Sequence, residues 1–202
     1  MTIQLHGLPG TRSTRASWLL EELGVPFETT RVEFSKGEHK SPAHVALQPH
    51  GLVPAMDLGE GPMIESAAMC LALADQFAAR KLAPALDSPA RARYYEAIVY
   101  AVSTLDESVI PIYFHKKVLP EAKRDHKVID AKLPTWNIAA DLLTKRLGDR
   151  KYIVGESFTA ADVVVGYDLI LAQEVGLLDN HPKLLAYTQS LLKRPAVKKA
   201  FG

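Results

Sequence analysis

The chain has 202 residues, which is enough for one or two globular domains with a buried core. Its 24 lysine and arginine residues nearly balance 23 aspartate and glutamate residues, so the charge gives no reason to expect a nucleic-acid partner or an acidic membrane surface. Hydrophobic residues make up 48% and charged residues 23%, a composition typical of a folded domain and unlike a disordered one.

The N-terminal residues Met1–Leu5 lack the basic and apolar regions of a secretion signal, and we find no segment with the ~20 apolar residues of a membrane span. We therefore expect a cytoplasmic protein without a membrane partner. Cys70 is the single cysteine, which excludes an intrachain disulfide and a zinc cluster built on thiolates. The spacing of His39, His44 and His50 matches no zinc site, so we expect solvated loop histidines and no metal.

The first eighty residues alternate between strand and helix signals. Ile3–Leu5 predicts a strand and Gly7–Gly10 a loop. A helix follows, capped by Thr11 or Ser13 and ended by Gly24, because apolar residues then recur at i, i+3, i+4 and i+7. These apolar positions are Ala16, Leu19, Leu20 and Leu23.

A second strand is predicted over Phe27–Val32. Ala55–Leu58 and Pro62–Ile64 then predict a hairpin, and Ser66 is expected to cap a helix with an apolar face that includes Cys70. This order of β-α-β followed by β-β-α is typical of a thioredoxin-like α/β domain, which we assign to residues 1–80.

Residues 81–89 lie in a proline-containing stretch without clear periodicity and are assigned to a linker. Apolar residues recur at helical spacing over residues 90–202, which predicts an all-α helical bundle as the second domain. Pro111 and Pro134 lie inside these patterns and are expected to break or kink their helices. Thr159 and Asp162 have the spacing of a capping box and predict a helix start.

Five segments in order along the chain resemble the cytosolic glutathione transferases, with features of the phi and beta types and of bacterial members. They are Ser13–Glu28, Gly37–Pro42 (GEHKSP), Gln48–Ala55 (QPHGLVPA), Ile64–Ala68 (IESAA) and Phe158–Asp162 (FTAAD). Each segment alone is common, but five in register are hard to reach by chance. The resemblance implies a glutathione site in the first domain, a homodimer and a role in detoxification.

Glutathione is an acidic tripeptide with two carboxylates, an ammonium group and a thiol. The helix that begins at Ser66 offers free N–H groups and the positive end of its dipole to the γ-glutamyl carboxylate, and Glu65 offers a carboxylate to the ammonium. Val53, restricted to extended geometry by Pro54, can pair its backbone with the cysteinyl residue. The resemblance implies a cis bond between Val53 and Pro54.

We assign the glycyl carboxylate to His39 and Lys40. Without the resemblance, this segment is equally well interpreted as a solvated charged loop. Leu52 stands where many relatives carry a lysine or glutamine, so this end of glutathione is expected to be held less tightly.

The family activates the thiol with a tyrosine, serine or cysteine in the loop after the first strand, and this chain departs from each pattern. We assign the role first to Thr11 and then to Ser13, with Arg12 able to stabilise a thiolate electrostatically. Simple capping of the helix is the alternative for both hydroxyls.

Four residues of the second domain are assigned to an electrophile site, although aromatic residues at helical spacing more often belong to a core. They are Tyr94, Ile98, Tyr113 and Phe114. We thus expect an enzyme that conjugates glutathione to, or reduces with it, small hydrophobic electrophiles. A protein of the same fold that binds glutathione without catalysis, a ligandin, is the alternative.

Overall fold

The computed structural model describes residues 2–202, which form two compact units. The first unit comprises the described residues up to Leu82 together with Arg194–Gly202, and the second is Ala83–Lys193. The boundary lies inside the stretch that we assigned to a linker. The last nine residues, which the sequence prediction placed in the all-α domain, belong by their contacts to the first unit.

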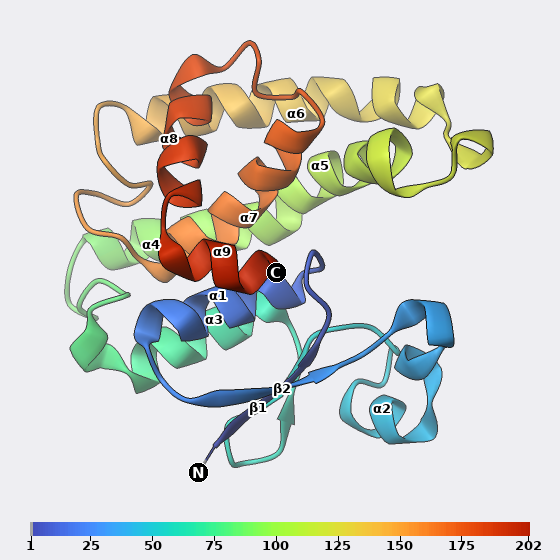
Figure 1. Ribbon diagram of the computed structural model, residues 1–202. Helices are drawn as coiled ribbons and strands as arrows, with labels where there is room; N and C mark the ends of the chain where they lie inside the picture. The colour runs from blue at the N-terminus through green and yellow to red at the C-terminus, as the bar shows by residue number, and fades with distance from the viewer. Residues whose placement is uncertain (1) are drawn as a thin grey trace. The chain divides into compact units, whose positions relative to one another are not determined.

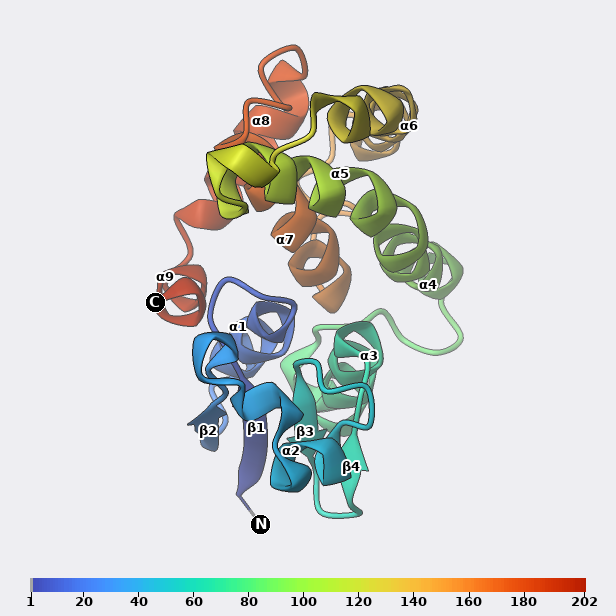
Figure 2. The same cartoon turned by 90° about the vertical axis from the view of Figure 1, so that its right-hand side faces the viewer.

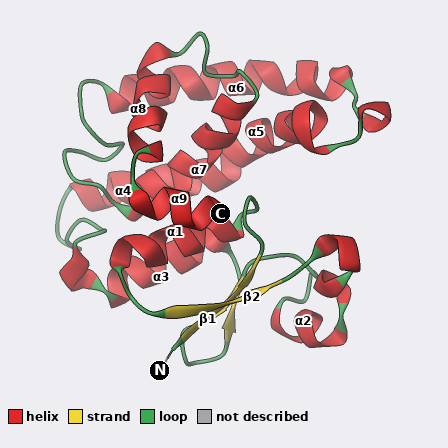
Figure 3. Cartoon of the chain, viewed as in Figure 1, coloured by secondary structure: helices red, strands yellow, loops and turns green. Residues whose placement is uncertain are grey.

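The first unit is built on a four-stranded sheet with the order β2-β1-β3-β4. Figure 1 labels β1 and β2, Figure 2 labels all four strands, and Figure 3 draws the strands in yellow. Strand β1 pairs in parallel with β2 and antiparallel with β3, and β3 pairs antiparallel with β4. The elements are β1 (Ile3–Gly7), α1 (Ser13–Leu23), β2 (Phe27–Arg31), α2 (Pro42–Leu47), β3 (Ala55–Asp57), β4 (Pro62–Met63), α3 (Ser66–Gln76) and α9 (Pro195–Phe201). The predicted thioredoxin-like arrangement and hairpin are confirmed.

Helices α1 and α3 pack together on one face of this sheet (Figure 2). The four apolar positions predicted for α1 are all buried, and Trp18 and Leu73 are fully buried in the same layer. Gly24 ends α1 in the left-handed conformation, so the predicted stop is correct.

Helix α9 lies against α1, although the two are far apart in the sequence (Figure 1). The guanidinium of Arg194 donates from Nε and Nη2 to the two carboxylate oxygens of Glu22, each over 2.6 Å. Glu22 also accepts a 2.9 Å hydrogen bond from the indole of Trp18, and Lys199 pairs with Glu21. Because the two-pronged Arg194 contact is partly buried, it holds the chain end more firmly than an exposed ion pair would.

The second unit contains only helices among its described elements. They are α4 (Ala90–Tyr100), α5 (Asp106–Tyr113), α6 (His126–Leu147), α7 (Ala160–Glu174) and α8 (Pro182–Leu192). We expected Pro111 and Pro134 to break or kink their helices; the break is wrong, since α5 and α6 continue through them. The neighbours Ile112 and Trp136 are buried, and their packing offsets the ~3 kcal/mol cost of a proline inside a helix.

Helix α7 is the centre of the second unit and is buried along most of its length. The predicted capping box is present: Asp162 accepts from the backbone N–H of Thr159, and the Thr159 side chain caps the N3 backbone. The other carboxylate oxygen of Asp162 accepts from the Ile153 N–H at 2.8 Å and from the Tyr187 hydroxyl at 2.6 Å. One buried carboxylate therefore joins α7, α8 and the loop before α7.

By length and composition alone, the helical run Ala90–Val118 is apolar enough to cross a membrane, with a mean hydropathy of 1.3 over its most apolar window. We did not expect this from the sequence. Core helices meet the same criteria, and 44% of that window is buried inside the fold. Within this run, α4 packs on α7 and α5 packs on α6 and α7, as in the core of a helical bundle.

We expect the substitution Asp162→Ala to lower the free energy of unfolding by about 3 kcal/mol, because it leaves several buried donors without an acceptor. Urea unfolding followed by circular dichroism measures the loss. Glu156→Ala, an exposed acid in the preceding loop, is the matched control. A loss below about 1 kcal/mol for Asp162→Ala would contradict the role of this carboxylate as a junction.

Candidate functional site

The strand directions bring the predicted site segments to one end of the sheet. His6 near the end of β1 pairs with Ala55 at the start of antiparallel β3, and Met56 pairs with Met63 at the end of β4. The loop after β1, the turn before β3 and the segment leading to α3 therefore share this end. The segment after β2 leaves from the same end, because β2 runs parallel to β1.

The start of α3 is marked by backbone strain at Glu65. This exposed residue has a φ of 70°, a left-handed value that costs a non-glycine residue about 1–3 kcal/mol. Ser66 does not cap the helix as expected but is its first residue. Its buried hydroxyl accepts a 3.5 Å hydrogen bond from Nη1 of Arg15, so a guanidinium lies beside the N-terminus of α3. This end of α3 is suited to a carboxylate.

The bond between Val53 and Pro54 is cis, as the resemblance implied. Pro54 is buried while Val53 is partly exposed and lies just outside the strand ladder. The buried ring of His44, on α2, donates from Nε2 to the carbonyl oxygen of Leu52 at 2.6 Å. Because a carbonyl carries no proton, this contact places the ring proton on Nε2. Helix α2 thus holds the turn that presents Val53.

His44 is accordingly not the solvated loop histidine that we expected. The expectation failed because the sequence does not show that the short helix Pro42–Leu47 packs back onto the turn. His44 also affects His6 on β1. Partial burial and the nearby charge of His44 lower the pKa of His6, while the charge of Asp57 acts to raise it.

Lys40 contacts the turn that precedes β3. Its ammonium group donates a 3.0 Å hydrogen bond to the carbonyl of His50, which leaves further protons for a ligand. Gly51 is required here, because a Cβ at this position would lie 2.8 Å from the Lys40 side chain and from the His39 carbonyl. The ring of His39 packs edge-on against Phe34 with the ring centroids 4.6 Å apart. Leu52 is exposed and offers only an apolar side chain.

The loop after β1 contains a closed network of hydroxyl groups. Thr11 donates its hydroxyl proton to the Leu8 carbonyl at 2.6 Å. The Ser13 hydroxyl lies 2.9 Å from the Thr11 hydroxyl and accepts from the Leu8 N–H. Since the Thr11 hydroxyl already donates its one proton to Leu8, Ser13 must be the donor in the hydrogen bond between the two hydroxyls. Both hydroxyl protons are therefore used inside the loop.

The three residues assigned to catalysis differ in their access to a ligand. Ser13 is only 3% exposed and packs against Gly7, where a Cβ would come within 2.6 Å of it. Thr11 is partly exposed and Arg12 is exposed. Neither Thr11 nor Ser13 is the N-cap residue of α1, which is Arg12. Of the two hydroxyl-bearing residues, Thr11 is therefore the more exposed.

Two of the four residues assigned to an electrophile site are buried in the core of the helical unit. Tyr94 is 0% and Ile98 1% exposed, so neither is accessible to a substrate in this conformation. Phe114 is 44% exposed. Tyr113 donates its hydroxyl to Glu174 over 3.1 Å, and burial together with Glu174 raises its pKa.

Sequence reasoning missed Arg15 and the role of His44. Arg15 is fully buried. Its place in the sequence could have indicated this, because Arg15 lies three residues before Trp18 and four before Leu19 and so shares the apolar face of α1 with them. Cys70 is inert as expected, because burial raises its pKa to about 12. Its thiol donates to the Arg15 carbonyl, which further ties α3 to α1.

Within residues 2–202, no three side chains of the metal-binding types gather closely enough to hold an ion. The residues at this sheet end instead offer a helix N-terminus, an extended backbone segment, a carboxylate and a lysine. The fold is thus a thioredoxin-like domain followed by a helical domain, and this set of groups has the chemistry that a short charged peptide requires.

Comparison with known proteins identifies the family. Residues 1–74 match the model of the glutathione S-transferase N-terminal domain, and residues 105–201 match that of the C-terminal domain. Glutathione S-transferase 1 of Zea mays is 31% identical over 195 residues, which cover 92% of this chain and 89% of that protein. Glutathione S-transferase GstB of Escherichia coli is 31% identical over 184 residues, covering 89% and 88%. The chain belongs to the glutathione S-transferase family.

Solved structures agree with this assignment. A glutathione transferase family member from Pseudomonas fluorescens, with two glutathione bound, aligns with a TM-score of 0.88 and 26% identity over 99% of this chain and 92% of that one. Glutathione transferase F7 from Populus trichocarpa aligns with a TM-score of 0.90 over 98% and 97%. Its identity of 23% supports the fold alone.

The contact between His44 and Leu52 yields a test of the turn geometry. We expect His44→Leu to weaken glutathione binding about tenfold, because Leu52 loses its donor and Val53 is no longer held. Titration calorimetry measures the affinity. His44→Gln, whose amide can replace the Nε2 proton, should restore most of it. His50→Gln, at an exposed position, is the control. Equal affinities of His44→Leu and His44→Gln would contradict the positioning role.

Proposed function

We propose that this chain is a glutathione transferase that binds glutathione at the end of its sheet and activates the thiol for attack on small hydrophobic electrophiles. The observation that carries the proposal is the meeting of four chain segments at that sheet end, each with the chemistry that one part of glutathione requires. Relatives across almost the whole chain bear the name glutathione S-transferase, which supports it.

The γ-glutamyl end is bound at the start of α3. Its carboxylate accepts from the first backbone N–H groups of the helix and from the hydroxyl of Ser66, whose oxygen already faces the Arg15 guanidinium. Glu65, exposed and turned out by its left-handed backbone, receives the ammonium group. The strain at Glu65 is the cost of presenting a carboxylate and a helix N-terminus side by side.

The rest of the peptide extends along the turn before β3. Val53 pairs its backbone N–H and C=O with the cysteinyl residue, in the manner of an added strand. Lys40, and His39 beside it, receive the glycyl carboxylate. Leu52 adds no polar contact, so the glycyl end depends on Lys40 more than on the residue that precedes Val53.

Thiol activation is assigned to Thr11. A thiol with a pKa near 8.5 is only a few per cent ionised at neutral pH, so a donor to the sulfur is needed to favour the thiolate. When glutathione binds, the Thr11 hydroxyl turns from the Leu8 carbonyl to the sulfur and still accepts from Ser13. Ser13 positions Thr11, and Arg12 adds positive charge at the exposed side of the loop.

The closed hydroxyl network also favours the second candidate function, a ligandin of the same fold. If Thr11 keeps its proton on the Leu8 carbonyl, the loop has no hydroxyl donor for the sulfur and glutathione is bound without activation. The two functions share the binding site and differ only in where this proton points.

Glutathione affinity tests the binding site. We expect Ser66→Ala and Glu65→Gln each to weaken binding about ten- to a hundredfold, because each removes a hydrogen bond to a charged group. Titration calorimetry gives the dissociation constants. Ser35→Ala and Glu60→Gln, both at exposed positions outside the proposed contacts, are the matched controls. Binding that all four variants leave unchanged would place glutathione elsewhere.

The thiolate absorbance of bound glutathione, titrated with pH, tests activation. In the unmodified protein we expect a thiol pKa well below that of free glutathione. Thr11→Ala should return the pKa toward the free value and lower kcat about a hundredfold, the usual cost of one lost donor to a developing anion. Thr11→Ser should retain most of the activity.

Ser13→Ala separates positioning from capping in the same assay. If Ser13 positions Thr11, Ser13→Ala lowers kcat while Thr11→Ser does not. If the role of Ser13 is purely structural, Ser13→Ala changes only the free energy of unfolding. An unshifted thiol pKa in the unmodified protein would favour the ligandin. A loss of activity in Arg12→Ala alone would transfer the catalytic role to Arg12.

The remaining parts of the proposal are a homodimer and a role in detoxification, which come from the resemblance, and a cytoplasmic location, which was expected from the sequence. Light scattering measures the oligomeric state. Phe114 is the exposed member of the four residues first assigned to the electrophile site, and its replacement by alanine is expected to change KM for a hydrophobic electrophile without changing glutathione affinity.

A further inference from the structure

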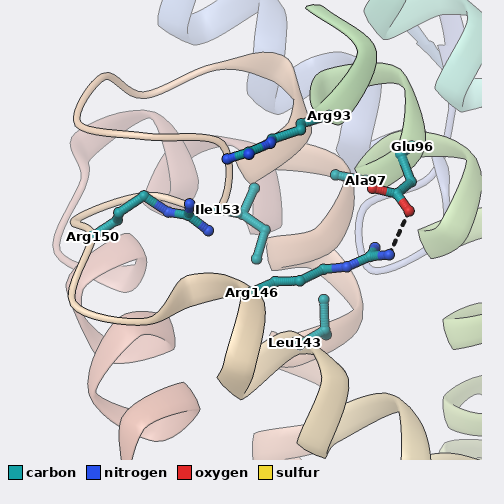
Figure 4. Close-up of a pocket in the computed structure, with 7 residues that line it drawn as sticks. All are labelled: Arg93, Glu96, Ala97, Leu143, Arg146, Arg150 and Ile153. Carbon is teal, nitrogen blue, oxygen red and sulfur yellow. Dashed lines mark hydrogen bonds and ion pairs between the residues drawn. The ribbon is translucent and has the colours of Figure 1, made fainter. Parts of the chain in front are cut away.

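The helical unit contains a pocket of about 130 Å³ that the glutathione site does not use (Figure 4). Three arginines line it: Arg93 from α4, Arg146 from α6 and Arg150 from the loop after α6. Ala97, Leu143 and Ile153 supply its apolar wall.

Among residues 2–202, only Arg146 of these three arginines forms an ion pair with a carboxylate. Arg146 pairs with Glu96, the single acid of the pocket, and its guanidinium lies 5.4 Å from the centre of the Tyr100 ring. This pair fixes both side chains and offsets the carboxylate of Glu96. Three guanidinium groups and one carboxylate leave the pocket with a formal charge of +2.

Arg93 and Arg150 extend toward one another over Ile153 (Figure 4). Among residues 2–202, neither forms an ion pair with a carboxylate. The Nε atom of Arg150 is buried and has no hydrogen-bond partner. A buried donor without an acceptor and two facing cations both cost free energy, and a bound anion would relieve both costs.

We propose that this pocket binds a phosphate dianion, either free phosphate or the phosphate end of a small monoester. The planar guanidinium donates in a two-pronged geometry that matches phosphate oxygens, and the unpaired Nε of Arg150 is one of the two donors needed for it. The formal charge of the pocket equals that of the dianion with opposite sign. The proposal is independent of glutathione, because all seven lining residues belong to the helical unit.

The backbone around the pocket is held before any ligand arrives. The Ile153 N–H donates to Asp162, the Tyr152 N–H donates to the Gly155 carbonyl, and the Arg150 N–H donates to the Leu147 carbonyl. The loop that carries Arg150 is therefore fixed on both sides, so little ordering entropy is lost on binding.

Titration calorimetry of sodium phosphate into the full-length protein, near neutral pH and with sodium chloride at matched ionic strength as the reference, tests the site. We expect saturable binding, and a rise of about 3 °C in Tm at tenfold excess over the dissociation constant. Arg93→Gln and Arg150→Gln should each weaken binding at least about tenfold. Lys145→Gln, an exposed residue of α6 with the same change in charge, should bind as the unmodified protein does.

Three results would overturn the proposal: no phosphate effect beyond that of chloride, unchanged binding in both arginine variants, or an equal loss in Lys145→Gln. Arg93 is exposed, so its replacement is not expected to disturb folding, and circular dichroism checks this for each variant. Glutathione affinity should stay the same in all of them.

Repeating the titration with glycerol 3-phosphate distinguishes the two sources of the phosphate group. Tighter binding of the ester than of inorganic phosphate indicates a site for the phosphate end of a small molecule. Equal or weaker binding of the ester indicates a site for free phosphate. Both results support a phosphate site, and failure of both ligands to bind excludes it.

Discussion

The pairing directions of four short strands are the constraint on which the proposed glutathione site depends. Because β1 runs parallel to β2 and antiparallel to β3, the chain leaves or enters three strands at one end of the sheet, and β4 ends there too. Site residues as far apart in the sequence as Thr11 and Ser66 thereby lie at the same end of the sheet. The residues that stabilise this arrangement, Arg15 and His44, are buried and lie behind the groups that would touch a ligand.

Periodicity and turn residues were sufficient to predict the strands, the hairpin and the capping box of α7, because each depends on residues close in sequence. The pairing of β1 with β3, which joins Gln4 to Asp57, was expected only from the order of the elements along the chain. The same reasoning did not find that His44 reaches Leu52, which depends on how a short helix packs back. It also predicted breaks or kinks at Pro111 and Pro134, where the helices continue without a break because tertiary packing outweighs a local preference. The assignment of catalysis to the loop after β1 stays a prediction, and within that loop only the structure distinguishes the partly exposed Thr11 from the buried Ser13.

Asp162 and Arg150, two polar residues of the helical unit, differ in how completely their hydrogen bonds are satisfied. Asp162 accepts from four donors, and burial nevertheless raises its pKa. Arg150, on the loop that Asp162 holds, keeps a buried donor without an acceptor. A satisfied buried group stabilises a fold, whereas an unsatisfied one inside a rigid frame is a reason to look for a ligand.

The attachment of α9 to α1 has a consequence for synthesis of the chain. The sheet unit is completed by its last nine residues, and the whole helical unit lies between the two parts in the sequence. On the ribosome, the contact between Glu22 and Arg194 therefore forms only after residues 194–202 have emerged. The helical unit is built from the continuous segment Ala83–Lys193, so all of its residues are made before the last contact of the sheet unit can form.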